Sequence, residues 1–117
     1  GGMDALRSKS LALTECFMRL VTERCAGHGL RCITPHDAPH RGSQVALVRD
    51  EGAYAIVQAL IARGVVGDVR APDVLRFGFT PLYIRFVDVW DAVEHLRDVL
   101  DSSEWKQERF NQKAAVT

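Results

Sequence analysis

The sequence has little of the features that mark several specialised protein classes. It contains three cysteines in 117 residues, an odd number without Cys-x-x-Cys spacing, so neither a disulfide framework nor a zinc site is indicated. We interpret Cys16, Cys25 and Cys32 as reduced core thiols. Charge of one sign is not in excess either, because 15 basic residues balance 15 acidic ones and no stretch gathers Lys and Arg. Nucleic acid is therefore not an expected partner.

Long apolar runs are also missing. Charged residues interrupt each run well short of the roughly 20 residues that span a bilayer, so we expect no membrane segment. A secretory leader is not expected, because Arg7 and Lys9 follow Met3 without an apolar stretch and cleavage site behind them. We interpret Gly1 and Gly2 as the remnant of an expression tag, and the expected location is the cytoplasm.

What the sequence does contain is the composition of one folded domain. Hydrophobic residues make up 47% and charged residues 26%, which is near the average for globular proteins. We divide the chain into a start (1–3), a helix that leads into the domain (4–28), a small α+β domain (29–104) and a polar tail that frays (105–117).

Hydrophobic periodicity predicts three helices and three or four strands. The predicted order is helix 4–25, strands 30–34 and 43–49, helix 54–63, a short edge strand 65–70, strand 74–79 and helix 86–100. Asp4 is the expected N-cap of the first helix, Gly27 and Gly29 its terminators, and Gly64 the end of the second helix. This order indicates a small, mostly antiparallel sheet of three to four strands with helices packed on one face. No Gly-rich phosphate loop opens a helix, which argues against nucleotide binding.

The first helix carries an apolar surface wider than the roughly 100° stripe of an ordinary surface helix. Two interpretations stay open: the helix is well buried within this domain, or it joins the domain to a neighbour that this chain lacks.

Arg76 stands in the middle of the apolar run 74–79, where a charged side chain requires a reason. One possibility is a surface arginine that reaches water from an edge strand or pairs with Asp73 or Asp68. The other is a ligand site, because a guanidinium presents paired donors to a carboxylate and stays charged at any relevant pH.

Other polar candidates are weaker. His36 and His40 lie in a loop with two prolines and lack a third ligand at fixed spacing, so we expect no metal. Ser43 has no histidine and acid placed to activate it, and Arg41 is more simply an anchor for its loop. Among the residues of the third helix and beyond, we expect Trp90 in the core, His95 at the surface, and Trp105 over an edge or against a partner.

Three stretches resemble the C-terminal small domain of the bacterial kynureninase family. They are Arg41-Gly42-Ser43-Gln44-Val45, the run 70–83 (Arg-Ala-Pro-Asp-Val-Leu-Arg-Phe-Gly-Phe-Thr-Pro-Leu-Tyr) and Phe86-Val87-Asp88-Val89-Trp90. The resemblance implies an aspartate-aminotransferase-like fold, a homodimer, and hydrolysis of L-kynurenine to anthranilate and L-alanine in tryptophan catabolism. It also implies pyridoxal 5'-phosphate as cofactor, held by a lysine of a large domain.

For this chain the resemblance implies a substrate-binding role for Arg76, which matches the family's arginine for the substrate carboxylate. The lysines Lys9, Lys106 and Lys113 match no cofactor motif of the family, so we expect no catalytic residue and no bound cofactor in this segment. The segment alone should be inactive without the large domain and a second subunit. The alternative is a stand-alone amino-acid-binding regulatory module, or a purely structural one.

Overall fold

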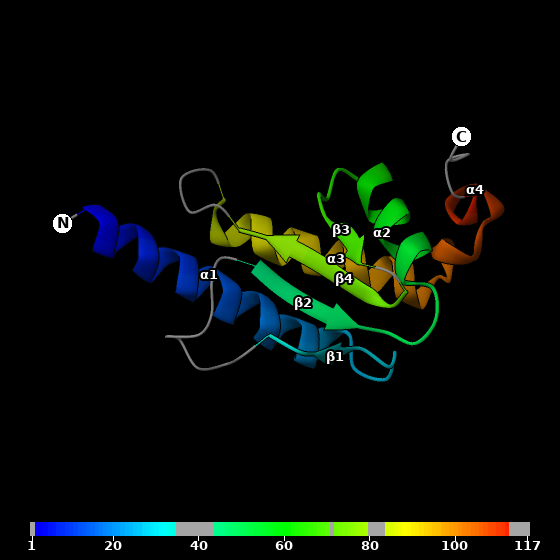
Figure 1. The fold of residues 1–117 in the computed structure, drawn as a ribbon, viewed down its shortest axis with the longest axis horizontal. Helices are drawn as coiled ribbons and strands as arrows, with labels where there is room; N and C mark the ends of the chain where they lie inside the picture. The colour runs from blue at the N-terminus through cyan, green and yellow to red at the C-terminus, as the bar shows by residue number, and fades with distance from the viewer. Residues whose placement is uncertain (1, 35–43, 71, 80–83, 113–117) are drawn as a thin grey trace.

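A computed structural model of the chain describes residues 2–34, 44–70, 72–79 and 84–112. The elements, in chain order, are α1 (Gly2–Arg24), β1 (Arg31–Cys32), β2 (Gln44–Val48), α2 (Ala53–Ala62), β3 (Asp68–Arg70), β4 (Val74–Gly78), α3 (Phe86–Asp101), the 3-10 turn η2 (Glu104–Lys106) and α4 (Glu108–Asn111) (Figure 1). The predicted order of helices and strands is confirmed as far as α3, and η2 and α4 were not predicted.

The four strands form one antiparallel sheet in the order β1-β2-β4-β3. The predicted pairing of the first two strands is confirmed, and so is the position of β3 at an edge. Because successive side chains of a strand point to opposite faces, β2 and β4 each present one apolar row. The inward side chains of these two strands, all at most 3% exposed, are Val45, Leu47, Leu75 and Phe77.

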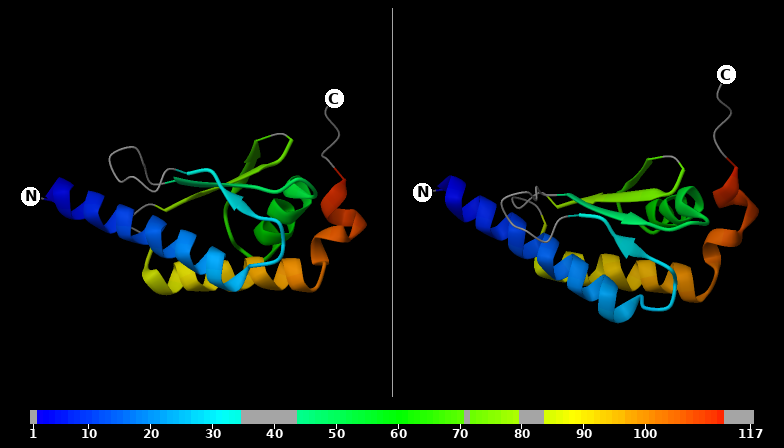
Figure 2. Two further views of the ribbon diagram at one scale, coloured as in Figure 1. Left: turned by 90° about the horizontal axis from the view of Figure 1, so that it is seen from below. Right: turned by 60° about the horizontal axis from the view of Figure 1, so that its bottom comes forward.

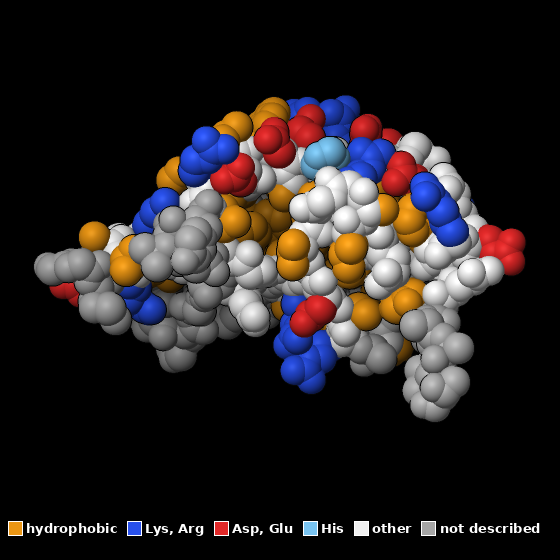
Figure 3. Space-filling view, turned by 90° about the horizontal axis from the view of Figure 1, so that it is seen from above, with side chains coloured by type: hydrophobic (Ala, Val, Ile, Leu, Met, Phe, Trp, Pro, Cys, Tyr) orange, Lys and Arg blue, Asp and Glu red, His pale blue; other side chains and the backbone are white. Residues whose placement is uncertain are grey.

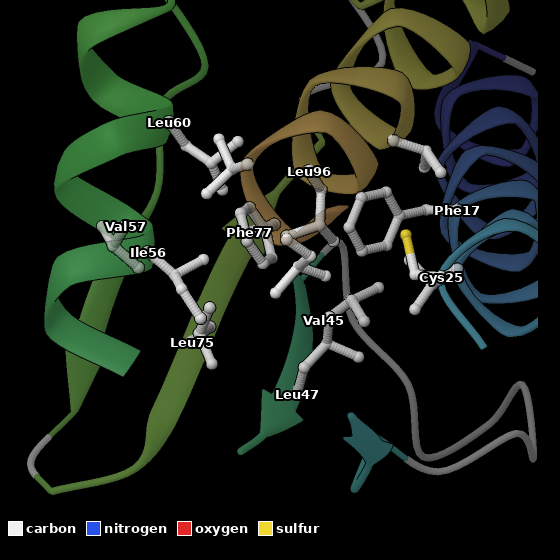
Figure 4. Close-up of a cluster of buried hydrophobic side chains, with 14 of the residues drawn as sticks. Phe17, Cys25, Val45, Leu47, Ile56, Val57, Leu60, Leu75, Phe77 and Leu96 are labelled. Carbon is white, nitrogen blue, oxygen red and sulfur yellow. The ribbon is translucent and has the colours of Figure 1, made fainter. Parts of the chain in front are cut away.

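The helices cover one face of this sheet and leave the other face open. Figure 2 shows α1 and α3 side by side beneath the sheet, with α2 on the same side. Figure 4 shows where their side chains meet the inward row of the sheet. At the centre Phe17 of α1 is 1% exposed, and its ring centroid lies 5.2 Å from that of Phe77 and 4.9 Å from that of Phe79. The predicted α+β arrangement with helices on one face is therefore confirmed.

Helix α1 begins at Gly2, so Asp4 lies inside its first turn and the prediction of Asp4 as N-cap is wrong. The chain leaves the helix through Gly27 and Gly29, whose φ values of 87° and 76° confirm them as terminators. The buried face of the helix runs from Leu13 to Cys25, whereas its N-terminal part extends past the sheet (Figure 1). A neighbour for that part of the helix stays a prediction.

Two expectations about tryptophans are wrong. Trp90 is 42% exposed, because the buried stripe of α3 passes along its neighbour Val89, and the Arg24 guanidinium covers its ring at 4.8 Å. Trp105 is only 6% exposed, because Gly52 has no side chain and leaves room for the indole ring.

The expectation of a fraying tail from residue 105 is likewise wrong for the described residues 105–112. Trp105 lies in η2, and Phe110 in α4 is 5% exposed and belongs to the same core. Asn111 donates side-chain hydrogen bonds to the carbonyl oxygens of Trp105 (2.8 Å) and Gln107 (2.9 Å). This segment is part of the domain because its two aromatic side chains bury apolar area against α2 and α3.

Candidate functional site

Arg76 is the central residue of β4, a strand with a neighbour on each side. The sheet register places it opposite Ala46 of β2 and Asp68 of β3. Its side chain lies on the outer face, since the adjacent Leu75 and Phe77 point into the core. That face has no helix over it in the described part of the chain (Figure 2), so a charged side chain there remains in contact with water.

The guanidinium of Arg76 is held by Asp68 in a two-pronged ion pair. Nε donates to Oδ1 at 2.8 Å and Nη2 donates to Oδ2 at 2.7 Å. These hydrogen bonds lower the pKa of the Asp68 carboxyl and raise the pKa of Arg76. The pairing with Asp68 that the sequence left open is therefore present, whereas Asp73 uses its backbone carbonyl to accept from the Arg49 N–H at 3.0 Å.

This pairing leaves one edge of the guanidinium available. A guanidinium has five N–H bonds, and Asp68 accepts those on the Nε and Nη2 side. The end formed by Nη1 and Nη2 has no acceptor among the described residues. Because Asp68 fixes the plane of the group, that end has a defined direction. A second carboxylate can be bound there by two parallel hydrogen bonds.

A shallow hollow of about 280 Å³ lies beside this side chain. Its walls are formed by residues of β2, of β4, of the turn that leads into β3 and of β3 itself: Gln44, Val66, Gly67, Asp68, Arg76 and Gly78. The hollow therefore combines one fixed cation, one carboxylate, a side-chain amide and an apolar rim. This set suits a small zwitterion, because an amino acid carries both signs of charge within a few bonds.

A second hollow, also of about 280 Å³, adjoins the first and shares Val66 and Gly78 with it. It lies between the end of α2, the end of β4 and α3, and Figure 3 shows hydrophobic side chains at its bottom with acidic side chains beside it. His95 lies at this hollow, and its Nδ1 accepts a hydrogen bond from Nη1 of Arg63 at 3.2 Å. It is half-buried, so the expectation of a simple surface residue is incomplete.

Arg63 is the centre of a polar cluster at the rim of this second hollow. Its Nη2 donates to Oε1 of Glu104 at 2.7 Å, which lowers the pKa of the Glu104 carboxyl. Its Nη1 lies 3.3 Å from a carboxylate oxygen of Asp98. Because each of these charges has a partner within the chain, the cluster joins α2, α3 and η2 and is not a free binding group.

The weaker polar candidates from the sequence lie in one segment of the chain. Residues 35–43, with His36, His40, Arg41 and Ser43, lie outside the described residues. Within the described ranges no three His, Cys, Asp or Glu side chains are placed to hold a metal ion. Nor does any described helix have the length and apolar character needed to cross a membrane.

Four residues that line the Arg76 hollow were not predicted from the sequence to do so: Gln44, Val66, Gly67 and Gly78. Gln44 and Gly78 face each other only through the β2–β4 register. Glycine inside a strand is a recognised sign of a close backbone approach, so Gly78 could have been noticed. Nothing in the local sequence marks Val66.

Comparison with known proteins decides the family of this chain. A family model described as the kynureninase C-terminal domain matches residues 6–96. The chain belongs to the kynureninase family. Kynureninases of Burkholderia mallei (strain SAVP1) and Burkholderia pseudomallei (strain K96243) are each 58% identical to it over 115 residues. The kynureninase of Pseudomonas fluorescens is 52% identical over 115 residues.

These alignments cover 98% of the chain but 27% of each of these kynureninases. The chain thus corresponds to the C-terminal domain of the family and spans about a quarter of the relatives' length. The recognition made from the sequence is confirmed.

The described residues do not fit pyridoxal phosphate. No lysine lines the hollow beside Arg76, since Lys9 lies on α1 and Lys106 lies against Trp105, with Nζ 5.4 Å from the ring centroid. Lys113 lies outside the described residues. Arg76 is the one cation among the described residues that line the hollow, and it already forms an ion pair with Asp68. These residues therefore do not form a binding site for a phosphate dianion.

Proposed function

We propose that this chain is the carboxylate-binding part of a kynureninase that hydrolyses L-kynurenine to anthranilate and L-alanine. The observation that carries the proposal is the Arg76 guanidinium on the open sheet face, oriented by Asp68 and with its outer end available. A carboxylate bound at that end is fixed in both position and rotation. Rotation matters, because the bond to be cleaved must lie at a defined angle to the reacting centre.

Asp68 acts on this site through Arg76. Its carboxylate holds the guanidinium plane, which reduces the entropy lost when a substrate binds. It also adds a negative charge near the substrate carboxylate, and it repels an anionic group that approaches the Nε side. The substrate carboxylate is therefore directed to the Nη1 and Nη2 end.

The chemistry belongs to the part of the protein outside this segment. The cofactor of the family, pyridoxal phosphate, supplies an electron sink for cleavage of the substrate when it is bound. We propose that a large domain holds it, that this domain faces the open side of the sheet, and that the whole enzyme is a cytoplasmic homodimer. The relatives' greater length supports a missing domain. The segment alone should then show no kynureninase activity.

The test compares Arg76 with Arg70, a second arginine that projects from the same face but does not line the hollow. In the full-length polypeptide, Arg76→Ala should lower kcat/KM for L-kynurenine by about 100-fold or more, since two charged hydrogen bonds are lost. Arg76→Lys should recover part of the lost activity, because lysine restores the positive charge but not the paired N–H donors of the guanidinium. Arg70→Ala should behave as the unchanged enzyme. Equal effects of the two alanine variants would remove the basis of the proposal.

A complementation experiment tests the division of labour. The segment and the remainder of the polypeptide are produced separately, and anthranilate is measured by fluorescence for each alone and for the mixture. Activity in the mixture only is the expected result. Activity of the segment by itself would contradict the placement of the chemistry elsewhere, and calorimetric binding of L-alanine to the segment by itself would favour a stand-alone binding module.

A further inference from the structure

Gly78 occupies the position on β4 where a side chain would stand beside Arg76. The two residues are two apart on one strand, so they share the outer face. Gly78 lines both hollows, and it pairs with Gln44 across the sheet. The floor between the Arg76 guanidinium and Gln44 is therefore bare backbone.

Neither the backbone conformation of Gly78 nor its packing against the described residues requires glycine at this position. Gly27, Gly29, Gly52 and Gly64 have φ values between 76° and 87°, which explains a glycine at each of them. Gly67 is explained by packing, because a Cβ there would lie 3.0 Å from the Arg76 carbonyl oxygen. Among the described residues, a Cβ at Gly78 would meet only Cγ of Gln44, at 3.9 Å, which is an ordinary contact, and the φ of Gly78 lies outside the left-handed region.

Glycine in a strand also has an energetic disadvantage of roughly 0.5–1 kcal/mol relative to alanine, because it loses more backbone entropy on folding. A residue that is unfavourable for the strand, and that the fold does not require, calls for a cause outside the fold. Close approach of a ligand to the backbone is such a cause. Any side chain at this position would project into the 280 Å³ hollow that Arg76 lines.

We propose that Gly78 is a specificity-determining residue, which leaves room for the carboxylate and α-carbon of an amino acid to reach the free end of the Arg76 guanidinium. This inference rests on the proposed carboxylate-binding function of Arg76. The bare strand lets a ligand lie flat against β4, whereas a side chain at 78 would fill the space in which its carboxylate must sit. Val66, which is 85% exposed on the rim of both hollows, borders the same space with an apolar surface.

The test measures the dissociation constant of L-alanine by calorimetry in the cofactor-loaded full-length polypeptide, together with kcat and KM for L-kynurenine. Gly78→Ala should weaken L-alanine binding about fivefold and Gly78→Val roughly tenfold or more, because each added methyl group overfills the site. The thermal midpoint should not fall, since both replacements suit a strand better than glycine. Val74→Ile, an added methylene on the same face of β4 but outside the hollows, is the matched control and should leave binding unchanged.

Arg76→Ala separates failure of this inference from failure of the proposed function. Loss of L-alanine binding in Arg76→Ala with unchanged binding in Gly78→Val would overturn the inference and leave the proposed function standing. Unchanged binding in Arg76→Ala would overturn both. If Gly78→Val does not fold, Gly78→Ala decides alone: binding equal to that of Val74→Ile contradicts the inference, and weaker binding supports it.

Discussion

Replacement of Gly52 by alanine should destabilise the protein much more than the same replacement at Gly64. Both glycines have nearly the same backbone conformation, with φ of 81° and 86°. Their surroundings differ. A Cβ at Gly52 would lie only 2.4 Å from Cζ3 and 2.6 Å from Cε3 of Trp105, whereas a Cβ at Gly64 would meet none of the described residues within 4 Å. The pair therefore separates backbone strain from steric conflict.

The two contributions can be given magnitudes. An L side chain in the left-handed region costs about 1–2 kcal/mol, so this is the loss expected for Gly64→Ala. Overpacking of a well-filled site adds about 1–3 kcal/mol. The free energy of unfolding should then fall by about 2–5 kcal/mol for Gly52→Ala. The indole ring cannot easily move aside, because it is 6% exposed and the Arg49 guanidinium covers it at 4.9 Å.

Urea unfolding followed by circular dichroism measures these differences, and a double-mutant cycle with Trp105→Ala assigns them. In the background without the indole ring, Gly52→Ala should cost no more than Gly64→Ala, so the coupling energy should be about 1–3 kcal/mol. If the two glycine variants lose the same stability in the parent protein, Trp105 does not lie on Gly52. That result would also contradict the packing of residues 105–112 against the rest of the domain.

Three further predictions concern the core, a surface ion pair and a thiol. Phe17→Ala should reduce the free energy of unfolding by about 3–5 kcal/mol, because the ring is 1% exposed at the centre of the core. Urea titration measures this loss, and a loss below about 1 kcal/mol would contradict the central position of Phe17. The Arg24 guanidinium, whose Nη2 lies 3.0 Å from a Glu94 carboxylate oxygen, lowers the pKa of that carboxyl from its usual 4.5. The pair therefore stabilises the fold above pH 4.5, and this stabilisation is lost as the pH falls through the lowered pKa of Glu94 in the folded protein. The free energy of unfolding of Glu94→Gln should therefore decrease less on acidification than that of the parent protein. Burial raises the pKa of the Cys25 thiol to about 11. A thiol reagent at pH 8 should therefore modify Cys25 only at the rate of unfolding. Rapid modification of Cys25 in the native protein would contradict its burial.

The positions of helices and strands follow from local spacing, and this part of the structure could be predicted. Leu13, Phe17 and Val21 recur at helical intervals and are buried as that spacing requires. The same kind of argument was wrong for Trp90, because spacing shows that a helix has a buried stripe but not which of two adjacent residues lies at its edge. Val89 is fully buried while Trp90 is 42% exposed.

Of the candidate site, the sequence draws attention to one residue and not to its surroundings. Arg76 is conspicuous because a charge interrupts an apolar run. The residues beside it depend on strand register. Asp68 lies opposite Arg76 only because β3 and β4 pair in one particular alignment, and Gln44 lines the same hollow only because β2 pairs with β4 so that Gln44 lies opposite Gly78. A shift of one residue in either pairing would send these side chains to the other face.

The sequence by itself determined the family, the order of the elements and the presence of a guanidinium that needs a reason to be there, because these depend on residues close together in the chain. The tertiary structure alone decided which edge of that guanidinium remains available, that no side chain stands beside it at position 78, and that Trp105 packs over Gly52. Each of these depends on contact between residues distant in sequence, and such contact is set by the packing of the whole core and not by local preference.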